Sequence, residues 1–551
     1  MRCNAASPDP MLDAFRIALG QLNQSVGDIG ANADSILAAR REARDADLVV
    51  FPELHLIGYP PEDLVLKPAL VEKAAAQLER LAEASGDDGP AMLVGSAFVR
   101  DGALHNGVAL LDQGRIAAVR FKHELPNYGT FDEMRLFQPG PLPEPVILRG
   151  TMIGVPICED IWRPDVCRHL ADFGAEMFIC INGSPYEINK EALRIEGIAR
   201  RRAGDTGIPL AYLNRVGGQD ELVFDGGSFV VNGNGQLAAR ARDWEEQVLQ
   251  TSWTRTARGW RCDRGDLAQE TPQPETIYCA MVLALRDFVE RSACEGVVVG
   301  LDGARDSALV AALAVDALGP ECVTLALVPP LAGGAQALDD ARACADSLGA
   351  RCREITLDSR IAEALEALDV CFVGPEREAG ERLAARMRAL VLGAFAESQG
   401  AMLLSSATKS DFSLGRAPSC ASATGGYSPL KDAYATTVAM LATWRNGAIP
   451  HIGLGPEGTI FTASILARTP PLPDGVDDAG RLDAMLFGLV EHDKSIDQMV
   501  ADGFPRAVLR QIEERLHASE ALRRQSPPGV KLSPRNFGRD RRYPITHAFR
   551  S

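Results

Sequence analysis

Three polar residues stand at the ends of apolar runs in the first half of the sequence. Glu53 follows LVVFP, Lys122 follows AAVRF, and Cys158 follows IGVPI and precedes EDIW. A strand that turns sharply into a helix lifts a thiol above the sheet and directs helix N–H dipoles at it, so Cys158 can be a nucleophile. A cysteine that cleaves an amide needs a base for the thiol proton and a donor for the tetrahedral oxyanion. A carboxylate and a lysine supply these two roles.

No single one of these residues is diagnostic. A lone F-P-E is also what a strand end followed by a turn looks like, and a lone buried cysteine is more often inert than reactive. The order Glu, Lys, Cys, with each residue at the end of an apolar run, is much more specific for amide hydrolysis.

The elements that must position these residues alternate in type. Short β-rich runs are separated by helical stretches such as ADSILAARREARDA between residue 15 and about residue 240, which predicts a layered α/β domain. The runs are FRIALGQL, ADLVVFPEL, AMLVGSAFV, NGVALL, RIAAVRF, TMIGVPIC, EMFICING, PLAYLNRV and GGSFVV.

The rest of the chain predicts a second domain. Residues 243–274 form a charged stretch with Trp and Pro that reads as a connector. Beyond it, a helix (TIYCAMVLALRDFVERS) precedes EGVVVGLDGARDSALVAALAVDALG, a strand, tight turn and helix, and the unit then repeats. This order predicts an open, mostly parallel sheet. We therefore divide the chain into domains at 11–242 and 275–551, as its 551 residues also suggest.

Charge and composition narrow the classes of partner. The formal charge of −17 argues against a surface for nucleic acid or anionic membranes, so small molecules are expected as ligands. The opening MRCNAASPDP lacks the pattern of a signal peptide, and no apolar run is long enough for a membrane helix, which predicts a cytoplasmic protein. Met11 heads a more convincing start than Met1. The 12 cysteines include no C-x-x-C pair, so neither a metal site nor a disulfide framework is predicted.

Longer strings in the first half resemble the nitrilase superfamily, and in particular the glutaminase domain of glutamine-dependent NAD synthetases. They are FPELHLIGYPPEDL, KHELPNYGTFDEMRLF, GVPICEDIW, NGSPYEINK and NRVGGQDELVFDGGSF. The resemblance implies an αββα sandwich that hydrolyses glutamine without a cofactor. It also implies that Glu53 is the general base, that Lys122 stabilises the oxyanion and that Cys158 forms a thioester.

The same resemblance suggests supporting residues. Glu133 matches an additional glutamate that would hold the lysine. Four further residues fall where the family shapes its glutamine pocket, although packing alone would also account for the two tyrosines. These four are Tyr59, Tyr128, Glu159 and Ser184.

The second half resembles the ATP-dependent synthetase domain of the same family, which implies a doubly wound parallel sheet like that of adenine nucleotide alpha hydrolases. The family's phosphate loop is Ser-Gly-Gly-x-Asp-Ser, whereas this chain has DGARDS at 302–307, so that only Gly303, Asp306 and Ser307 match. Asp302 sets a carboxylate against phosphate, and Ala304 adds a methyl group where glycine permits close approach. Lys409 and Asp411, within SSATKSD, are further remnants of the nucleotide site.

Other departures from the family pattern follow along the domain. VPPLAGG replaces a Ser-rich segment, ERLAAR replaces a Glu-Asn-x-Gln-Ala-Arg stretch, and Cys420, Ala421 and Ser422 replace Tyr-Gly-Asp. A later Ser-Ala-Glu-Leu segment is not recognisable in ILARTPPLPDG. These losses predict an eroded ATP site, and thus a glutaminase fused to a pseudo-synthetase that makes no NAD.

Two alternatives stay open. The first is a divergent but active glutamine-hydrolysing NAD synthetase, which would use glutamine, deamido-NAD, ATP and Mg²⁺. The second is a non-catalytic nucleotide sensor or partner-binding module, against which the intact triad weighs. The resemblance also implies a homo-oligomer.

Overall fold

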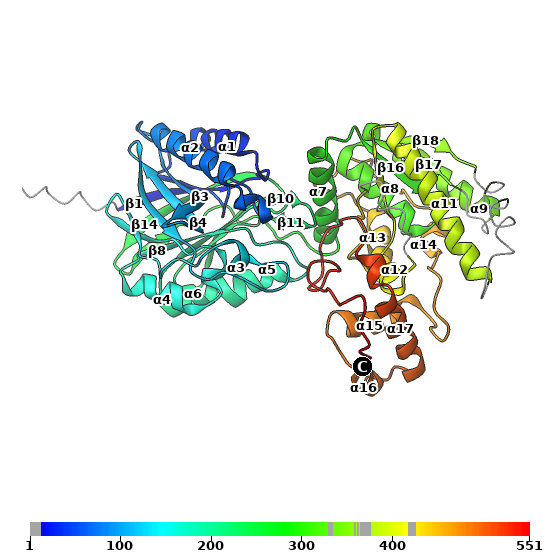
Figure 1. Ribbon diagram of the computed structural model, residues 1–551. Helices are drawn as coiled ribbons and strands as arrows, with labels where there is room; N and C mark the ends of the chain where they lie inside the picture. The colour runs from blue at the N-terminus through cyan, green and yellow to red at the C-terminus, as the bar shows by residue number, and fades with distance from the viewer. Residues whose placement is uncertain are drawn as a thin grey trace, which may run out of the picture. The chain divides into compact units, whose positions relative to one another are not determined.

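The protein divides into two compact units. The computed structural model describes residues 13–328, 334–356, 360, 363, 376–416 and 426–550 (Figure 1). Unit 1 comprises the chain up to Gln219 together with Phe224–Thr271, and unit 2 comprises Asp220–Val223 and the chain from Pro272 onward. No helix in these described ranges has the length and apolar character that crossing a membrane requires.

Unit 1 is built on two sheets. The first has seven strands in the order β15-β14-β1-β2-β3-β4-β5, and the second has six in the order β13-β12-β9-β8-β7-β6. The strands of the first sheet are β1 (Ala14–Gln21), β2 (Leu48–Val50), β3 (Ala91–Arg100), β4 (Ala103–Asp112), β5 (Arg115–Phe121), β14 (Gln247–Thr256) and β15 (Gly259–Cys262). Those of the second are β6 (Val146–Leu148), β7 (Thr151–Gly154), β8 (Met177–Asn182), β9 (Leu210–Asn214), β12 (Phe229–Val231) and β13 (Leu237–Arg240).

The two sheets pack face to face, with helices on their outer faces. Alternate strand residues such as Ile17 and Val50 of the first sheet and Ile179 and Leu213 of the second form one buried cluster. Helices α1 (Ile29–Glu42) and α2 (Pro68–Ala84) lie on one outer side, and α4 (Pro164–Asp172) and α6 (Arg200–Thr206) lie on the other (Figure 1). The αββα sandwich expected from the sequence is therefore confirmed.

The segment 243–274 differs from its prediction as a connector, because it contains β14 and β15. β14 pairs antiparallel with the whole of β1, from Ala14 opposite Thr254 to Gln21 opposite Gln247. Leu249, Thr251 and Trp253 are buried while the residues between them are exposed. Charged and polar residues on the exposed face conceal this period-two pattern in the sequence.

Unit 2 contains a parallel sheet in the order β18-β17-β16-β19, which confirms the doubly wound fold. Its strands are β16 (Val297–Leu301), β17 (Val323–Leu327), β18 (Arg351–Glu354) and β19 (Met402–Leu404). Helix α8 (Arg305–Leu318), which follows β16, is almost wholly buried. The other long helices of the unit are α7 (Glu275–Arg291), α9 (Gly334–Leu348), α11 (Glu376–Ser398), α13 (Ala435–Arg445), α15 (Ala479–Val490) and α17 (Arg506–Ala518). Shorter helices are α12 (Lys409–Leu414), α14 (Ala463–Ala467), α16 (Ile496–Ala501) and α18 (Glu520–Arg523).

Candidate active site

Cys158 lies on a strained turn between a strand end and a short helix. After β7, Ile157 forms an isolated bridge with Ile181 of β8, and the 3-10 helix η2 (Cys158–Ile161) begins directly after it. Cys158 has a φ of 47°, which lies in the left-handed region that non-glycine residues rarely adopt and that is enriched at functional turns. The side chain is buried and lines a cavity of about 280 Å³. The sharp turn expected around the candidate nucleophile is therefore present.

Glu53, Lys122 and Glu133 form one buried hydrogen-bonded cluster. The Lys122 Nζ donates to Glu53 Oε1 at 2.7 Å and to Glu133 Oε1 and Oε2 at 2.9 and 2.8 Å. Glu53 is oriented further by the Asn106 Nδ2, which donates to Oε1 at 2.8 Å, and by the Gly183 N–H, which donates to Oε2 at 2.9 Å. The strand ends of the first sheet thus hold the base and the cation in one place.

The charges of this cluster act on Cys158 and Lys122. Burial raises the pKa of the Cys158 thiol well above its ordinary value, Glu53 raises it further, and Lys122 only partly offsets both. Burial opposes the charge on Lys122, but Glu133 and Glu53 outweigh it and hold the pKa of the amine well above its ordinary value. The resting thiol therefore keeps its proton near neutral pH, and a neighbouring carboxylate is needed to remove it.

Asp160 joins the segment after Lys122 to the turn that carries Cys158. One carboxylate oxygen accepts the N–H groups of His123 and Glu124 at 3.1 and 2.8 Å, and the other accepts that of Ile157 at 2.9 Å. Asp160 is fully buried, and this burial raises its pKa to about 6 in spite of those bonds. Nothing in the motif order singles out Asp160, so sequence reasoning missed this clamp.

The cavity beside Cys158 takes in three of the four predicted pocket residues. Tyr128, Glu159 and Ser184 line it, and the Tyr128 hydroxyl donates to Glu159 Oε2 at 2.9 Å. Tyr59 is placed differently, because its hydroxyl is buried and donates to Glu133 Oε1 at 3.1 Å. Lining residues that the sequence did not single out are Phe131, Trp162, Glu187, Ile188, Asn189, Lys190 and Leu193.

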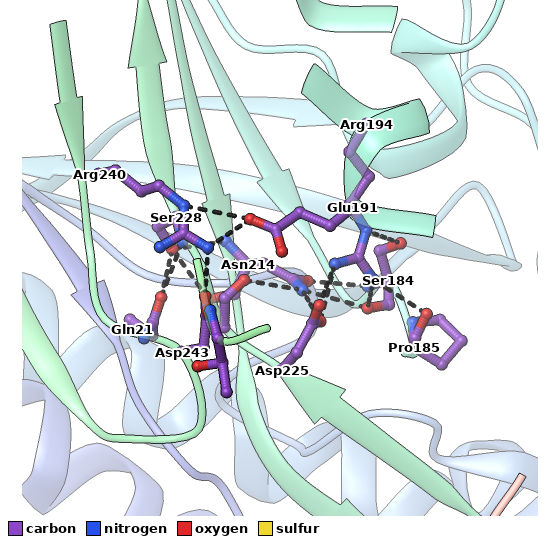
Figure 2. A network of polar contacts seen from close by, with 12 residues as sticks. Gln21, Ser184, Pro185, Glu191, Arg194, Asn214, Asp225, Ser228, Arg240 and Asp243 are labelled. Carbon is purple, nitrogen blue, oxygen red and sulfur yellow. Dashed lines mark hydrogen bonds and ion pairs between the residues drawn. The ribbon is translucent and has the colours of Figure 1, made fainter. Parts of the chain in front are cut away.

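A buried polar network holds Ser184 from behind (Figure 2). Arg194 Nη1 forks onto both oxygens of Asp225 at 2.7 and 2.6 Å, while its other nitrogens donate to Ser184 Oγ and to the carbonyls of Ser184 and Pro185. Asn214 Nδ2 joins the same carboxylate and also donates to the Ser184 carbonyl. All three guanidinium nitrogens of Arg194 are bonded in this charge-assisted network, which fixes its geometry. Arg194 lies in the string NGSPYEINKEALR and Asp225 in the string ELVFD. Nothing in either string indicates that the two residues form an ion pair.

In unit 2, residues 302–307, called the 302–307 loop below, run from the end of β16 into the first turn of α8. Asp302 Oδ1 accepts the Ala304 N–H at 3.0 Å and the Ser307 hydroxyl at 2.6 Å. Gly303 has a φ of 80°, and a side chain there would meet the Ala337 carbonyl at 2.3 Å. The loop therefore keeps the glycine that its turn requires. Two of its hydrogen-bond donors, the Ala304 N–H and the Ser307 hydroxyl, are already bonded to the Asp302 carboxylate.

A cavity of about 330 Å³ opens at this loop. Asp302, Asp306, Ser307 and Asp411 line it together with Arg388 and Arg416. Burial and the nearby charge of Asp411 raise the pKa of Asp306 to about 7, although Arg305 opposes the shift. Carboxylates and guanidinium groups facing one cavity could hold a magnesium nucleotide.

Lys409 does not join the residues that line this cavity. Its side chain is fully buried and its ammonium donates to Glu491, to Ser533 Oγ at 2.7 Å and to the Arg535 carbonyl at 2.9 Å, with Asp432 a further 2.9 Å ion-pair partner. These contacts indicate a structural role for Lys409. Most of the VPPLAGG stretch, and Cys420, Ala421 and Ser422, lie outside the described residues.

Comparison with known families assigns each of the two units to a different family. The carbon-nitrogen hydrolase family matches residues 16–261, and the NAD synthase family matches residues 277–527. The chain is 41% identical to the glutamine-dependent NAD(+) synthetase of Rhodobacter capsulatus, over 98% of this chain and 100% of that relative. It is 36% identical to the enzyme of the same name from Xylella fastidiosa, over 98% of this chain and all of that one.

Solved structures give the same result. The glutamine-dependent NAD+ synthetase of Acinetobacter baumannii, determined in complex with ADP, superposes with a TM-score of 0.77 at 33% identity, over 97% of this chain and 98% of that one. These matches run through both units, so they favour the active-synthetase alternative over the pseudo-synthetase that the loop changes predict. The chain belongs to the glutamine-dependent NAD synthetase family, with a carbon-nitrogen hydrolase domain followed by an NAD synthase domain.

Proposed function

We propose that this protein is an active glutamine-dependent NAD synthetase, which releases ammonia from glutamine in unit 1 and uses it with ATP to convert deamido-NAD to NAD in unit 2. The observation that carries the proposal is the 41% identity to a relative of that name over 98% of the chain. A similarity confined to the hydrolase half would not support the ligase activity.

In unit 1 the buried cluster of Glu53, Lys122 and Glu133 beside Cys158 supports the following roles. Glu53 accepts the Sγ proton of Cys158 as the sulfur attacks the amide carbon of glutamine. The C–N bond then breaks, the nitrogen leaves as ammonia with that proton, and a thioester remains. Glu53 next activates the water that hydrolyses the thioester to glutamate. Lys122 stabilises the oxyanion in both steps, a contribution for which about 10²–10³-fold in rate is typical.

In unit 2 the cavity at the 302–307 loop has donors that suit a triphosphate. Gly303 and Ser307 lie at the N-terminus of α8, where backbone N–H groups favour anions. Arg388 and Arg416 bring positive charge to the same cavity, and Asp306 and Asp411 are the carboxylates that would hold Mg²⁺. ATP would supply the activation of the deamido-NAD carboxylate that ammonia attacks.

One observation still favours a glutaminase whose second unit makes no NAD. The Asp302 carboxylate accepts the Ala304 N–H and the Ser307 hydroxyl, two groups that a phosphate would otherwise use. At 4 Å from a phosphate, its charge would cost about 1–4 kcal/mol in effective dielectrics of 80 to 20. Each of the two arginines can offset a penalty of this size, so we rank this function second.

The test is a single reaction with isotope-labelled substrate. The purified protein receives amide-¹⁵N-glutamine, deamido-NAD, ATP and Mg²⁺, and mass spectrometry follows NAD while chromatography follows AMP. We expect ¹⁵N-labelled NAD and AMP to form in equal amounts. Release of glutamate and ammonia without NAD or AMP would overturn the synthetase assignment and leave the glutaminase.

A further inference from the structure

Three side chains with different donor atoms meet at the first turn of α7, within unit 2. Glu275 and Cys279 are four residues apart on the helix, so they share one face. His451, in the loop after α13, faces both. Its Nδ1 lies 3.0 Å from Glu275 Oε1 and 3.9 Å from Cys279 Sγ, and the three ligand atoms all lie within 4.8 Å of one another.

These separations fit one small cation. A tetrahedral zinc ion, with bonds of about 2.0–2.2 Å to nitrogen and oxygen and about 2.3 Å to sulfur, places its ligand atoms roughly 3.3–3.6 Å apart. Two of the three separations, at 3.0 and 3.9 Å, lie on either side of this range, and the third is no longer than 4.8 Å, so small side-chain movements would bring all three atoms within bonding distance of one ion.

The loop that carries His451 is fixed to the unit just after the histidine. Arg286 of α7 donates from Nη2 to the Ile452 carbonyl at 2.6 Å, and the Leu454 N–H donates to the Asp316 carbonyl at 2.8 Å. The His451 N–H also donates to Glu275 Oε1 at 3.2 Å, which orients the carboxylate. A site held in this way loses little conformational entropy when an ion binds.

We propose that Glu275, Cys279 and His451 form a binding site for Zn²⁺ or a similar borderline transition-metal ion, which clips the loop after α13 to the start of α7. Thiolate, imidazole and carboxylate together are the donor set of zinc and cobalt, whereas Mg²⁺ takes oxygen ligands. The His451 side chain is 35% accessible, so the cluster reaches the surface although Cys279 itself is buried. Water completes the fourth position.

Binding exchanges a proton for the ion and involves no redox change. The Cys279 S–H bond breaks, its proton passes to solvent, and the sulfur lone pair forms the bond to the metal. Neutral His451 binds through Nδ1, so the hydrogen bond to Glu275 gives way to a shared ion. The competing interpretation is that Glu275 and His451 make only this hydrogen bond.

Cobalt titration of the whole chain separates the two interpretations. Protein freed of metal by dialysis against a chelator receives Co²⁺, and absorption spectra report thiolate-to-cobalt charge transfer in the near ultraviolet. We expect this band to saturate at one equivalent and to disappear when Zn²⁺ is added. It should be lost in Cys279→Ser and in His451→Ala, and retained in the matched control Cys322→Ser, whose thiol is exposed elsewhere.

If Cys279→Ser disturbs folding because Cys279 is buried, His451→Ala still tests the proposal, since the His451 side chain lies partly in solvent. Zn²⁺ should also raise the thermal transition of the wild type and not that of His451→Ala. A wild-type spectrum without thiolate charge transfer, or a band that survives His451→Ala, would overturn the proposal and leave a hydrogen-bonded pair. Neither result bears on NAD synthesis, so failure here is distinguishable from failure of the proposed function.

Discussion

Replacing Glu133 by glutamine should slow glutamine hydrolysis without unfolding unit 1. Glu133 offers two oxygens to the Lys122 ammonium, and Oε1 also accepts the Tyr59 hydroxyl. In Glu133→Gln one oxygen remains for these bonds, and an NH₂ group faces the ammonium in place of the other. Lys122 keeps its bond to Glu53, so the cation stays in place with one charged partner fewer.

The magnitude follows from the bond that is lost. A hydrogen bond to a charged group is worth about 1.5–3 kcal/mol, and each 1.36 kcal/mol is tenfold in rate. If the whole loss falls on the position of Lys122 in the transition state, kcat/KM for ammonia release drops about 10- to 100-fold. KM should change little, because Glu133 contacts the lysine and does not line the cavity beside Cys158.

The pH dependence sharpens this prediction. Burial raises the pKa of Glu133 to about 7, although Lys122 opposes the shift, so acidification through pH 7 protonates the carboxyl and weakens its hold on Lys122. The folded form takes up this proton more readily than the unfolded chain. Proton binding at Glu133 therefore contributes to the stability of the fold. This contribution is complete below pH 4.5 and is lost as the pH rises through about 7.

Steady-state ammonia release should therefore fall below about pH 7 in the wild type, and this limb should be absent in Glu133→Gln. Glu79→Gln, at an exposed site on α2, is the matched control and should keep both rate and pH profile. A Glu133→Gln protein with the wild-type rate and an unchanged profile would refute the reasoning that Glu133 positions Lys122.

Three further substitutions test other parts of the account. Lys122→Ala should lower the rate of ammonia release by about 10²–10³-fold. It should also lower the thermal transition temperature, because two buried carboxylates lose their cation. Adding Glu133→Gln to this variant should restore part of the lost stability. Asp160→Asn should cost about 1–3 kcal/mol of stability by turning an amide NH₂ toward backbone donors, with a drop in kcat and little change in KM for glutamine; an unchanged kcat would contradict the clamp. Asp302→Ser should lower the KM for ATP in the AMP-release assay by about tenfold, equivalent to about 1.4 kcal/mol, and a KM that stayed the same would show that Asp302 does not oppose phosphate.

The sequence predicts Glu53, Lys122 and Cys158 as a hydrolase triad, because each residue follows an apolar run and lies in a distinctive motif. Asn106, which orients Glu53, lies inside a strand, and its amide gives no signal that separates it from an ordinary surface residue. The same holds for Asp160, because the backbone N–H groups that it binds come together only in the folded chain. Hydrogen-bond partners distant in sequence are not visible to motif reasoning.

In unit 2, sequence motifs were a poor guide to two features of the candidate nucleotide site. Lys409 falls in a string that resembles the nucleotide site, yet its burial beside Glu491 and Asp432 gives it a structural role. The cations that line the cavity, Arg388 and Arg416, stand where no motif marks them. A count of changed residues in the phosphate loop takes no account of this positive charge, because arginines from segments distant in sequence cannot be assigned to the cavity without the fold.

The division of labour between the two units can be tested in one measurement, on Cys158→Ala supplied with deamido-NAD, ATP and Mg²⁺. With glutamine as the nitrogen source this variant should form no NAD, because thioester formation has lost its nucleophile. With an ammonium salt it should form NAD at the rate that the wild type shows with the same salt. NAD formation from glutamine by the variant would contradict the assignment of Cys158, and absence of NAD with ammonium in both proteins would contradict an active synthetase.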